Sequence, residues 1–193
     1  MTLVTEKDFD RRQRRTRAAL HGALDRLIDR LPFSKLSISQ ISDEADVGRP
    51  TFYRHFADVN ALLIDRLRGD LEEQAALARS LKATNAPSRT LLTEVTAFAC
   101  RRIATHPALY RALLDGSAGA NGVALFREQI AHIVGLLQTQ SGTRNPHRST
   151  LVVGAVAGAV AGFLLAWIED GLDPDIDEAA TLLVNMTEPL MVA

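Results

Sequence analysis

The sequence of 193 residues contains a single cysteine, Cys100, and aromatic residues make up only 5% of it. One cysteine permits no intramolecular disulfide and no cysteine-rich metal site. With so few aromatic rings, a core must be built from Leu, Ile, Val and Ala, and the 47% hydrophobic content is typical of a helix-rich globular protein. The first twelve residues lack an apolar segment, so we expect no signal peptide.

The chain also has little net charge, −1, which on its own disfavours a nucleic-acid partner. This charge is unevenly distributed, because residues 1–60 carry 11 Lys/Arg against 9 Asp/Glu, whereas the rest carry 11 against 14. A local basic patch on a nearly neutral protein is typical of a regulator with a separate DNA-reading domain, although a solvated run of charges gives the same pattern. The patch consists of Arg11, Arg12, Arg14, Arg15 and Arg17.

Hydrophobic residues recur with helical periodicity along the chain, and no strand-like alternation of useful length appears. We therefore expect an all-α fold of about nine helices. The first helix ends before Pro32, and the second is capped by Ser37 and ends before a turn at 46–48. The remaining helices are expected at about 49–55, 58–81, 88–105, 107–115, 121–140, 147–170 and 175–191.

The most apolar segment runs from Leu151 to Ile168, 18 residues without a charge. This length is at the short limit of a membrane span, and three glycines at intervals of four residues also occur in membrane helices. A single short span would leave only a short acidic segment that itself has an amphipathic helical pattern. We therefore favour a helix buried on nearly all sides in a protein that does not enter a membrane.

The stretch from Leu31 to Leu63 predicts a helix-turn-helix. Such a unit places a short helix with exposed polar side chains in the major groove of DNA, while a second helix braces it. Asp46 tolerates the left-handed conformation at the turn, and Pro50 fits the first turn of the second helix. The shared apolar core is Ile38, Ile41, Ala45, Val47, Phe52 and Phe56. The exposed residues suited to nucleic acid are Arg49, Thr51, Tyr53, Arg54 and His55.

The segment VGRPTFYRHFADVNALL resembles the signature of the TetR/AcrR family of bacterial transcription regulators, most specifically from Thr51 to Phe56. The resemblance covers about residues 10–65. It implies a helix-turn-helix DNA-binding domain over 10–57, joined to a helical effector-binding and dimerisation domain over 58–193. It also implies that residues 49–55 form the recognition helix, that its exposed residues contact DNA, and that Ser37 is a phosphate ligand.

The same resemblance implies a cytoplasmic, sequence-specific regulator. We expect a homodimeric repressor on a palindromic, double-stranded operator, released by a hydrophobic small-molecule effector. The alternative is a ligand-independent regulator or a degenerate helical interaction module, and a mobility-shift assay with operator DNA separates these from the main interpretation.

Three positions depart from the family's pattern. Asp46 stands where Gly is usual, Gly48 where a Ser or Thr cap is usual, and Val59 where a Lys usually contacts a phosphate. The fold tolerates these changes, but one phosphate contact is missing. Arg66 or the N-terminal arginines could replace it.

For the larger domain, the resemblance implies an effector pocket enclosed by helices, for which aromatic walls with a few polar groups are suitable. Its candidate residues are Phe98, Arg102, Tyr110, Phe126, Phe163 and Trp167. We also expect the last two helices to pair with those of a second copy, because one helix-turn-helix has too little contact for operator affinity. The candidate interface residues are Gly154, Gly158, Gly162, Leu182, Leu183 and Met186.

Residues of catalytic type form no recognisable constellation. The five histidines show no pairing at helical spacing, and no glycine-rich phosphate loop follows a strand. We therefore expect no enzyme activity, no cofactor and no metal ion.

Overall fold

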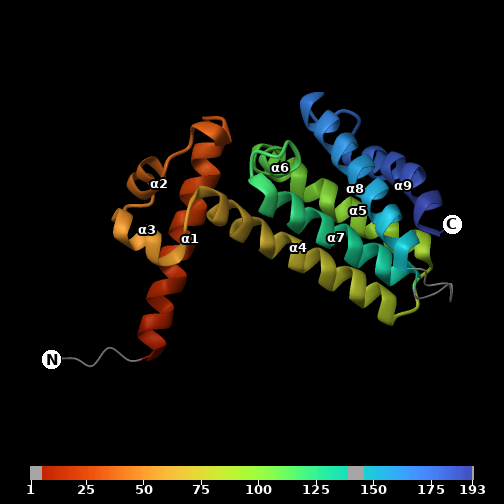
Figure 1. Ribbon diagram of the computed structural model, residues 1–193, viewed down its shortest axis with the longest axis horizontal. Coiled ribbons are helices and arrows are strands. Elements are labelled where there is room, and N and C mark those ends of the chain that lie inside the picture. The colour runs from red at the N-terminus through yellow and green to blue at the C-terminus, as the bar shows by residue number, and fades with distance from the viewer. Residues whose placement is uncertain (1–5, 139–145, 193) are drawn as a thin grey trace. The chain divides into compact units, whose positions relative to one another are not determined.

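The computed structural model describes residues 6–138 and 146–192, and it confirms the all-α prediction (Figure 1). Within these residues every regular element is helical. The helices are α1 (Glu6–Ile28), α2 (Ile38–Glu44), α3 (Arg49–His55), α4 (Val59–Ala83), α5 (Ser88–Thr105), α6 (Pro107–Leu114), α7 (Gly119–Gln138), α8 (Pro146–Glu169) and α9 (Ile176–Val192), with one 3₁₀ turn, η1 (Phe33–Lys35).

The chain divides into two compact units, residues 1–66 and 67–193, which we call the head unit and the body unit. The head unit contains α1, α2, α3 and the first residues of α4. The body unit contains the remainder of α4 and the helices that follow it. Because α4 is one continuous helix, it belongs to both units.

The head unit has a small apolar core to which each of its helices contributes. Phe52 of α3, Ile41 of α2 and Leu20 of α1 have no exposed surface. Burying a side chain of this size stabilises a fold by about 1.5–3 kcal/mol. Phe52 therefore fixes one side of α3 to the core, and the other side is left to face outward.

Local chemistry sets the helix ends around α2 and α3. The Ser37 Oγ accepts a hydrogen bond from the Gln40 N–H at 3.3 Å, and the Gln40 Oε1 accepts one from the Ser37 N–H at 2.9 Å. These two bonds form a capping box. Asp46 has a φ of 52° in the turn, and Pro50 lies in the first turn of α3, both as predicted. Asp58 caps α4 by accepting a backbone hydrogen bond at 2.7 Å.

The body unit is assembled from long helices that pack along one another (Figure 1). α5 packs along α9, α8 contacts both α7 and α9, and α6 contacts α5, α7 and α8. The core between them is aliphatic, as the composition requires. Its most deeply buried side chains, with at most 1% of their surface exposed, include Leu91, Ile103, Leu109 and Val134.

α8 is less buried than the sequence predicts. Between Thr150 and Glu169 it is long and apolar enough to cross a membrane, by length and composition alone. Only 28% of its most apolar window is buried within the chain, so the prediction of burial on nearly all sides is wrong for a single copy. α8 packs on α6, α7 and α9 through one side. The other side carries an exposed stripe of Leu151, Ala155, Gly158, Gly162 and Ala166.

Candidate nucleic-acid interface and ligand cavity

The candidate nucleic-acid interface is the outer side of α3. Tyr53 keeps 59% of its surface exposed while the edge of its ring rests against Phe52, with the two centroids 6.0 Å apart. A large polar ring is thus held outward by contact with the core. Of the other predicted contact residues, Arg49 and Arg54 are exposed, and Thr51 and His55 are half-buried.

Hydrogen bonds orient both arginines of α3. Arg54 Nη2 donates to Thr51 Oγ1 at 3.1 Å, within the same helix. Arg49 Nη2 donates to Ser39 Oγ at 2.5 Å, which joins the start of α3 to α2. A guanidinium has five N–H donors, so each arginine retains several for a guanine edge or a phosphate.

Ser37 caps α2, as the sequence predicts. Its hydroxyl donates to Gln40 Oε1 at 2.8 Å, and its backbone N–H donates to the same oxygen at 2.9 Å. Both donors of Ser37 therefore serve the cap of α2. This geometry shows the capping role, and the phosphate contact implied for Ser37 by the resemblance stays a prediction.

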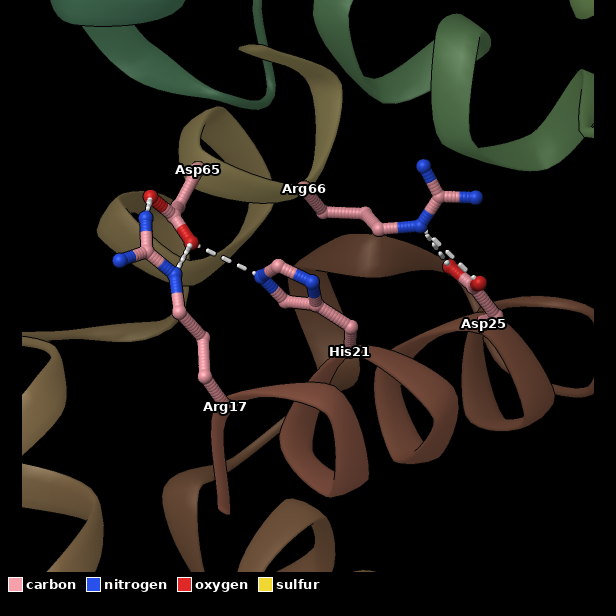
Figure 2. A network of polar contacts seen from close by, with 5 residues as sticks. All are labelled: Arg17, His21, Asp25, Asp65 and Arg66. Atoms are coloured by element: carbon pink, nitrogen blue, oxygen red, sulfur yellow. Dashed lines mark hydrogen bonds and ion pairs between the residues drawn. The ribbon is translucent and has the colours of Figure 1, made fainter. Parts of the chain in front are cut away.

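A polar network joins α1 to the first turns of α4 (Figure 2). Asp65 accepts from Arg17 Nε at 2.7 Å, and its Oδ2 lies 2.8 Å from His21 Nε2. One turn further along α1, Asp25 accepts from Arg66 Nε at 3.1 Å. Sequence reasoning missed this network. The available signal was the spacing of Arg17, His21 and Asp25 on one face of α1, but their partners lie more than 40 positions away.

The network also touches the residue that follows α3. The His21 ring lies 6.1 Å from the Phe56 ring, and the Arg17 guanidinium lies 6.0 Å from the same centroid. Phe56 is 7% exposed. The polar network and this aromatic contact therefore hold α1, the end of α3 and the start of α4 together.

Acidification should destabilise the head unit through His21. Burial lowers the pKa of His21 below its usual value of 6.5, although the hydrogen bond to Asp65 acts in the opposite direction. The folded chain then binds the proton more weakly than the unfolded chain does. The contribution of His21 to the free energy of unfolding is therefore fully present above pH 6.5, and it is lost as the pH falls from there through the pKa of the folded state. Urea unfolding at about pH 7.5 and about pH 5.5 measures this loss.

The variant His21→Gln should lose less stability than the wild type between these two pH values. Burial, followed by the charges of Arg54 and Arg17, also lowers the pKa of His55. The matched control is therefore His55→Gln, which measures how much of the pH dependence of stability comes from His55. An identical pH dependence in the wild type and His21→Gln would rule out the assignment to His21.

The body unit encloses a cavity of about 60 Å³ between α4, α5, α6, α7 and α8. Most of its lining is apolar. Four of the six predicted effector residues line it, namely Phe98, Arg102, Tyr110 and Phe126.

Phe163 and Trp167 lie outside this lining, where α8 contributes Val160 and Leu164 instead. Trp167 is only 2% exposed, and its indole N–H donates to the Pro174 carbonyl at 2.7 Å. This hydrogen bond therefore joins the end of α8 to the loop that follows it. Aromatic content alone could not reveal which side of α8 faces the cavity, because that depends on the rotation of the helix against its neighbours.

The polar part of the cavity centres on Asp70, which is 8% exposed. Its Oδ2 accepts from the Tyr110 hydroxyl at 3.0 Å, and its Oδ1 lies 3.8 Å from Arg102 Nε. Arg102 also donates to Glu73 and lies over the Phe98 ring, 5.2 Å from its centroid. The Arg102 guanidinium thus interacts with two carboxylates, so Asp70, Glu73 and Arg102 together have a formal charge of −1.

The outer side of α8 and α9 contains most of the predicted interface residues. Gly158 and Gly162 are exposed and Gly154 is half-buried. On α9, Leu182 and Met186 are 45% and 42% exposed. The prediction that Leu183 lies at the interface is wrong, because Leu183 is 3% exposed and belongs to the core of its own chain. It lies one position away from the outward-facing Leu182.

Cys100 behaves as a buried core residue. It has no exposed surface, and burial raises the pKa of its thiol to about 12. A thiol this reluctant to ionise is a poor nucleophile. Across residues 6–138 and 146–192, no three His, Cys, Asp or Glu side chains gather in a way that could hold a metal ion.

Comparison with known sequences finds similarity to bacterial regulatory proteins in the head unit. A family model for the bacterial regulatory proteins of the TetR family matches residues 22–65, from α1 into α4. The HTH-type transcriptional regulator YxbF of Bacillus subtilis is 37% identical over 79 residues, which are 39% of this chain. That match spans 21% of the length of YxbF.

Solved structures with a similar fold cover nearly the whole chain. The TetR-family repressor FadR of Thermus thermophilus, in complex with lauroyl-CoA, has a TM-score of 0.70 and 18% identity over 92% of this chain and 95% of that one. FadR from Bacillus subtilis, in complex with stearoyl-CoA, has a TM-score of 0.68 and 12% identity over 88% and 96%. NalD, the secondary repressor of a Pseudomonas aeruginosa multidrug efflux pump, has a TM-score of 0.65 and 18% identity over 92% and 96%. Structural similarity at 12–18% sequence identity shows a shared fold and nothing more.

The two kinds of comparison agree with each other. The sequence match contains the whole helix-turn-helix with α3 inside it, and the structural likeness shows that the fold of the helical body is shared as well. These relatives are transcription regulators rather than enzymes. Residues 22–65 therefore match the TetR family of bacterial regulatory proteins, and the chain as a whole has the fold of solved TetR-family regulators.

Proposed function

We propose that the protein is a homodimeric transcriptional repressor that binds a palindromic operator through α3 and leaves it when a small molecule occupies the body cavity. The observation that carries this proposal is the division of α3 into two sides. Phe52 anchors one side in the core, and Arg49, Tyr53 and Arg54 cover the other. Core packing alone does not require Arg49, Tyr53 and Arg54 at exposed positions of one short helix.

On the operator, Arg49 and Arg54 are the residues suited to guanine, because a guanidinium can bind O6 and N7 together. The Tyr53 hydroxyl is suited to a phosphate, and so are Thr51 and His55 at the edges of the helix. This division of roles predicts that Arg49 and Arg54 specify the sequence, while the others contribute position and affinity. Anisotropy titration of labelled duplexes that differ at single base pairs tests it.

Two copies would pair through α8 and α9. The exposed glycines and alanines of α8 let a partner helix approach closely, and Leu182, Met186 and Leu190 of α9 add apolar surface beside them. Covering this face also explains why an apolar helix can be largely unburied in one copy of a protein that stays outside membranes. The two heads would then enter successive major grooves, about 34–36 Å apart. We accordingly place the protein in the cytoplasm, where the operator lies.

The effector would be a small, mostly apolar molecule with a positive charge or a strong hydrogen-bond donor. The cavity lining is apolar apart from Asp70, Arg102 and two glutamines. The Arg102 guanidinium is shared between Asp70 and Glu73, an exposed residue outside the lining, so these three residues carry a formal charge of −1. That charge favours a cation over an anion. The preference separates this cavity from sites that hold the negatively charged acyl-CoA found in the FadR complexes.

Helix α4 would carry the signal. It holds Asp65 and Arg66 of the head network and, one turn later, Asp70 of the cavity. A ligand that contacts Asp70 favours one position of α4, and its effect on DNA affinity is limited to that preference, typically about 1–3 kcal/mol. By linkage, operator DNA must weaken the ligand by the same factor.

The ligand preference predicts which molecules stabilise the protein. Benzylamine and cyclohexylamine should raise the melting temperature more than benzoate and cyclohexanecarboxylate, because each pair differs chiefly in charge. In Asp70→Asn this discrimination should disappear, while the apolar contribution remains. The control Asp115→Asn removes an exposed carboxylate that is outside the cavity lining and should preserve the discrimination. Equal stabilisation by the carboxylates in the wild type would refute the proposed ligand class.

A further inference from the structure

The N-terminal part of α1 adds little to the head core. Among the α1 side chains that the structure describes, which begin at residue 10, the first buried one is Leu20. Between residues 10 and 18 every side chain is exposed except Thr16, which is half-buried. Residues 10–16 thus form about two turns of helix without a buried side chain. Its exposed positions hold the basic cluster, which we call the arginine arm and define as residues 11–15 of α1.

The arginine arm continues along α1 beyond the end of α3. Figure 1 shows α1 continuing past α3 toward its N-terminus. At the base of the arm, the Arg17 guanidinium lies 6.0 Å from the ring of Phe56, the residue that follows α3. With a rise of about 1.5 Å per residue, Arg11 lies about 9 Å further along the helix axis. That length corresponds to about three base pairs of duplex DNA.

The charges of the arm are available to a partner. Arg11, Arg12 and Arg15 make no ion pair with a described side chain, and Arg14 has only an exposed pair with Asp10 at 3.0 Å. Exposed pairs of this kind are weak and yield to competing anions. By contrast, Arg17 and Arg66 are held by Asp65 and Asp25 within the head network. Of the groups that could supply an additional phosphate contact, the arm is therefore the one left uncommitted.

We propose that the arginine arm binds the phosphates of duplex DNA that flank each half-site, outside the base pairs that α3 reads. This inference rests on the proposed DNA-binding function. The arm provides charge without the hydrogen-bonded orientation seen for Arg49 and Arg54, so it contributes affinity and not base preference. Each phosphate neutralised adds about 0.9 to the slope of log affinity against log salt. Three arginines in each of two chains therefore account for a slope of about 5.

The test compares the wild type with the triple variant Arg11→Gln, Arg12→Gln, Arg15→Gln. The probes are a duplex selected by the wild type from a random library, either trimmed to the selected site or extended by about ten base pairs on each side. On the extended duplex the variant should bind on the order of 10-fold or more weakly at low salt, and its salt slope should be smaller by about 5. On the trimmed duplex the two proteins should bind almost equally. The control Arg79→Gln, Arg101→Gln, Arg111→Gln removes the same charge from exposed positions of the body unit and should retain the wild-type slope.

Equal slopes for the wild type and the arm variant on the extended duplex would overturn the proposal while leaving the function of α3 intact. An equal loss on both duplexes would also overturn it, because the arm would then act within the half-site. Phosphatidylserine vesicles test the competing partner, a membrane surface. Vesicle binding that the variant loses, together with an unchanged DNA slope, would assign the arm to lipid instead. A wild type that selects no duplex would end both this inference and the proposed function.

Discussion

Replacing Gly158 with leucine should separate the proposed dimer into folded monomers. A Cβ atom added at Gly158 meets nothing within 4 Å in its own chain, so the substitution does not disturb the protomer. Leucine also favours a helix interior over glycine by roughly 0.8–1 kcal/mol. Across a two-fold interface the added side chain meets the partner twice, and overpacking costs about 1–3 kcal/mol at each site. The dimer dissociation constant should rise on the order of 100-fold or more.

Sedimentation velocity across a concentration series measures this change, and thermal unfolding checks that the chain still folds. The matched control is Gly135→Leu, because Gly135 is also exposed within a helix and also has nothing within 4 Å of the added Cβ. The control should remain a dimer. A Gly158→Leu protein that dimerises as tightly as the wild type would exclude this face of α8 from the interface.

The alanine substitutions Tyr53→Ala and Arg54→Ala should each weaken operator binding by about 1–3 kcal/mol. For Arg54 the loss should be concentrated on duplexes that carry the preferred base, because a guanidinium reads guanine directly. For Tyr53 the loss should be similar on all sequences, because a phosphate contact carries no base information. Competition titration with point-altered operator duplexes separates the two patterns.

Both side chains are exposed, and the contact with the core that Tyr53→Ala removes is the edge-on packing of the Tyr53 ring against Phe52. Arg79→Ala removes one positive charge from an exposed position of the body unit and controls for net charge alone. Operator affinities of Tyr53→Ala and Arg54→Ala equal to that of the wild type would show that α3 is not the recognition helix.

The helix-turn-helix of the head unit was predictable from sequence because short-range chemistry determines its helix ends. Ser37 and Gln40 form a cap three residues apart, Asp46 accepts a left-handed φ, and Asp58 caps the next helix. Each of these signals involves neighbours in the chain. The boundaries of α3 and its inward Phe52 follow from them, and so does the identity of its outward residues.

The features that sequence could not supply depend on how distant helices rotate against one another. Asp65 meets Arg17 and His21 across more than 40 positions, and no local pattern specifies that register. The same reason explains why Leu183 belongs to the core while Leu182, its neighbour, faces outward. The exposed side of α8 was missed because an apolar helix can be covered by its own chain or by a second copy, and composition does not distinguish the two.

The central claim is that two copies of the chain bind one symmetric DNA site through α3. Selection of duplexes from a random library by the purified wild-type protein, followed by native mass spectrometry of the complex, tests it most directly. We predict a palindromic consensus with half-site centres about 10–10.5 base pairs apart, occupied by two chains. No enrichment, or an asymmetric site bound by a single chain, would contradict the claim.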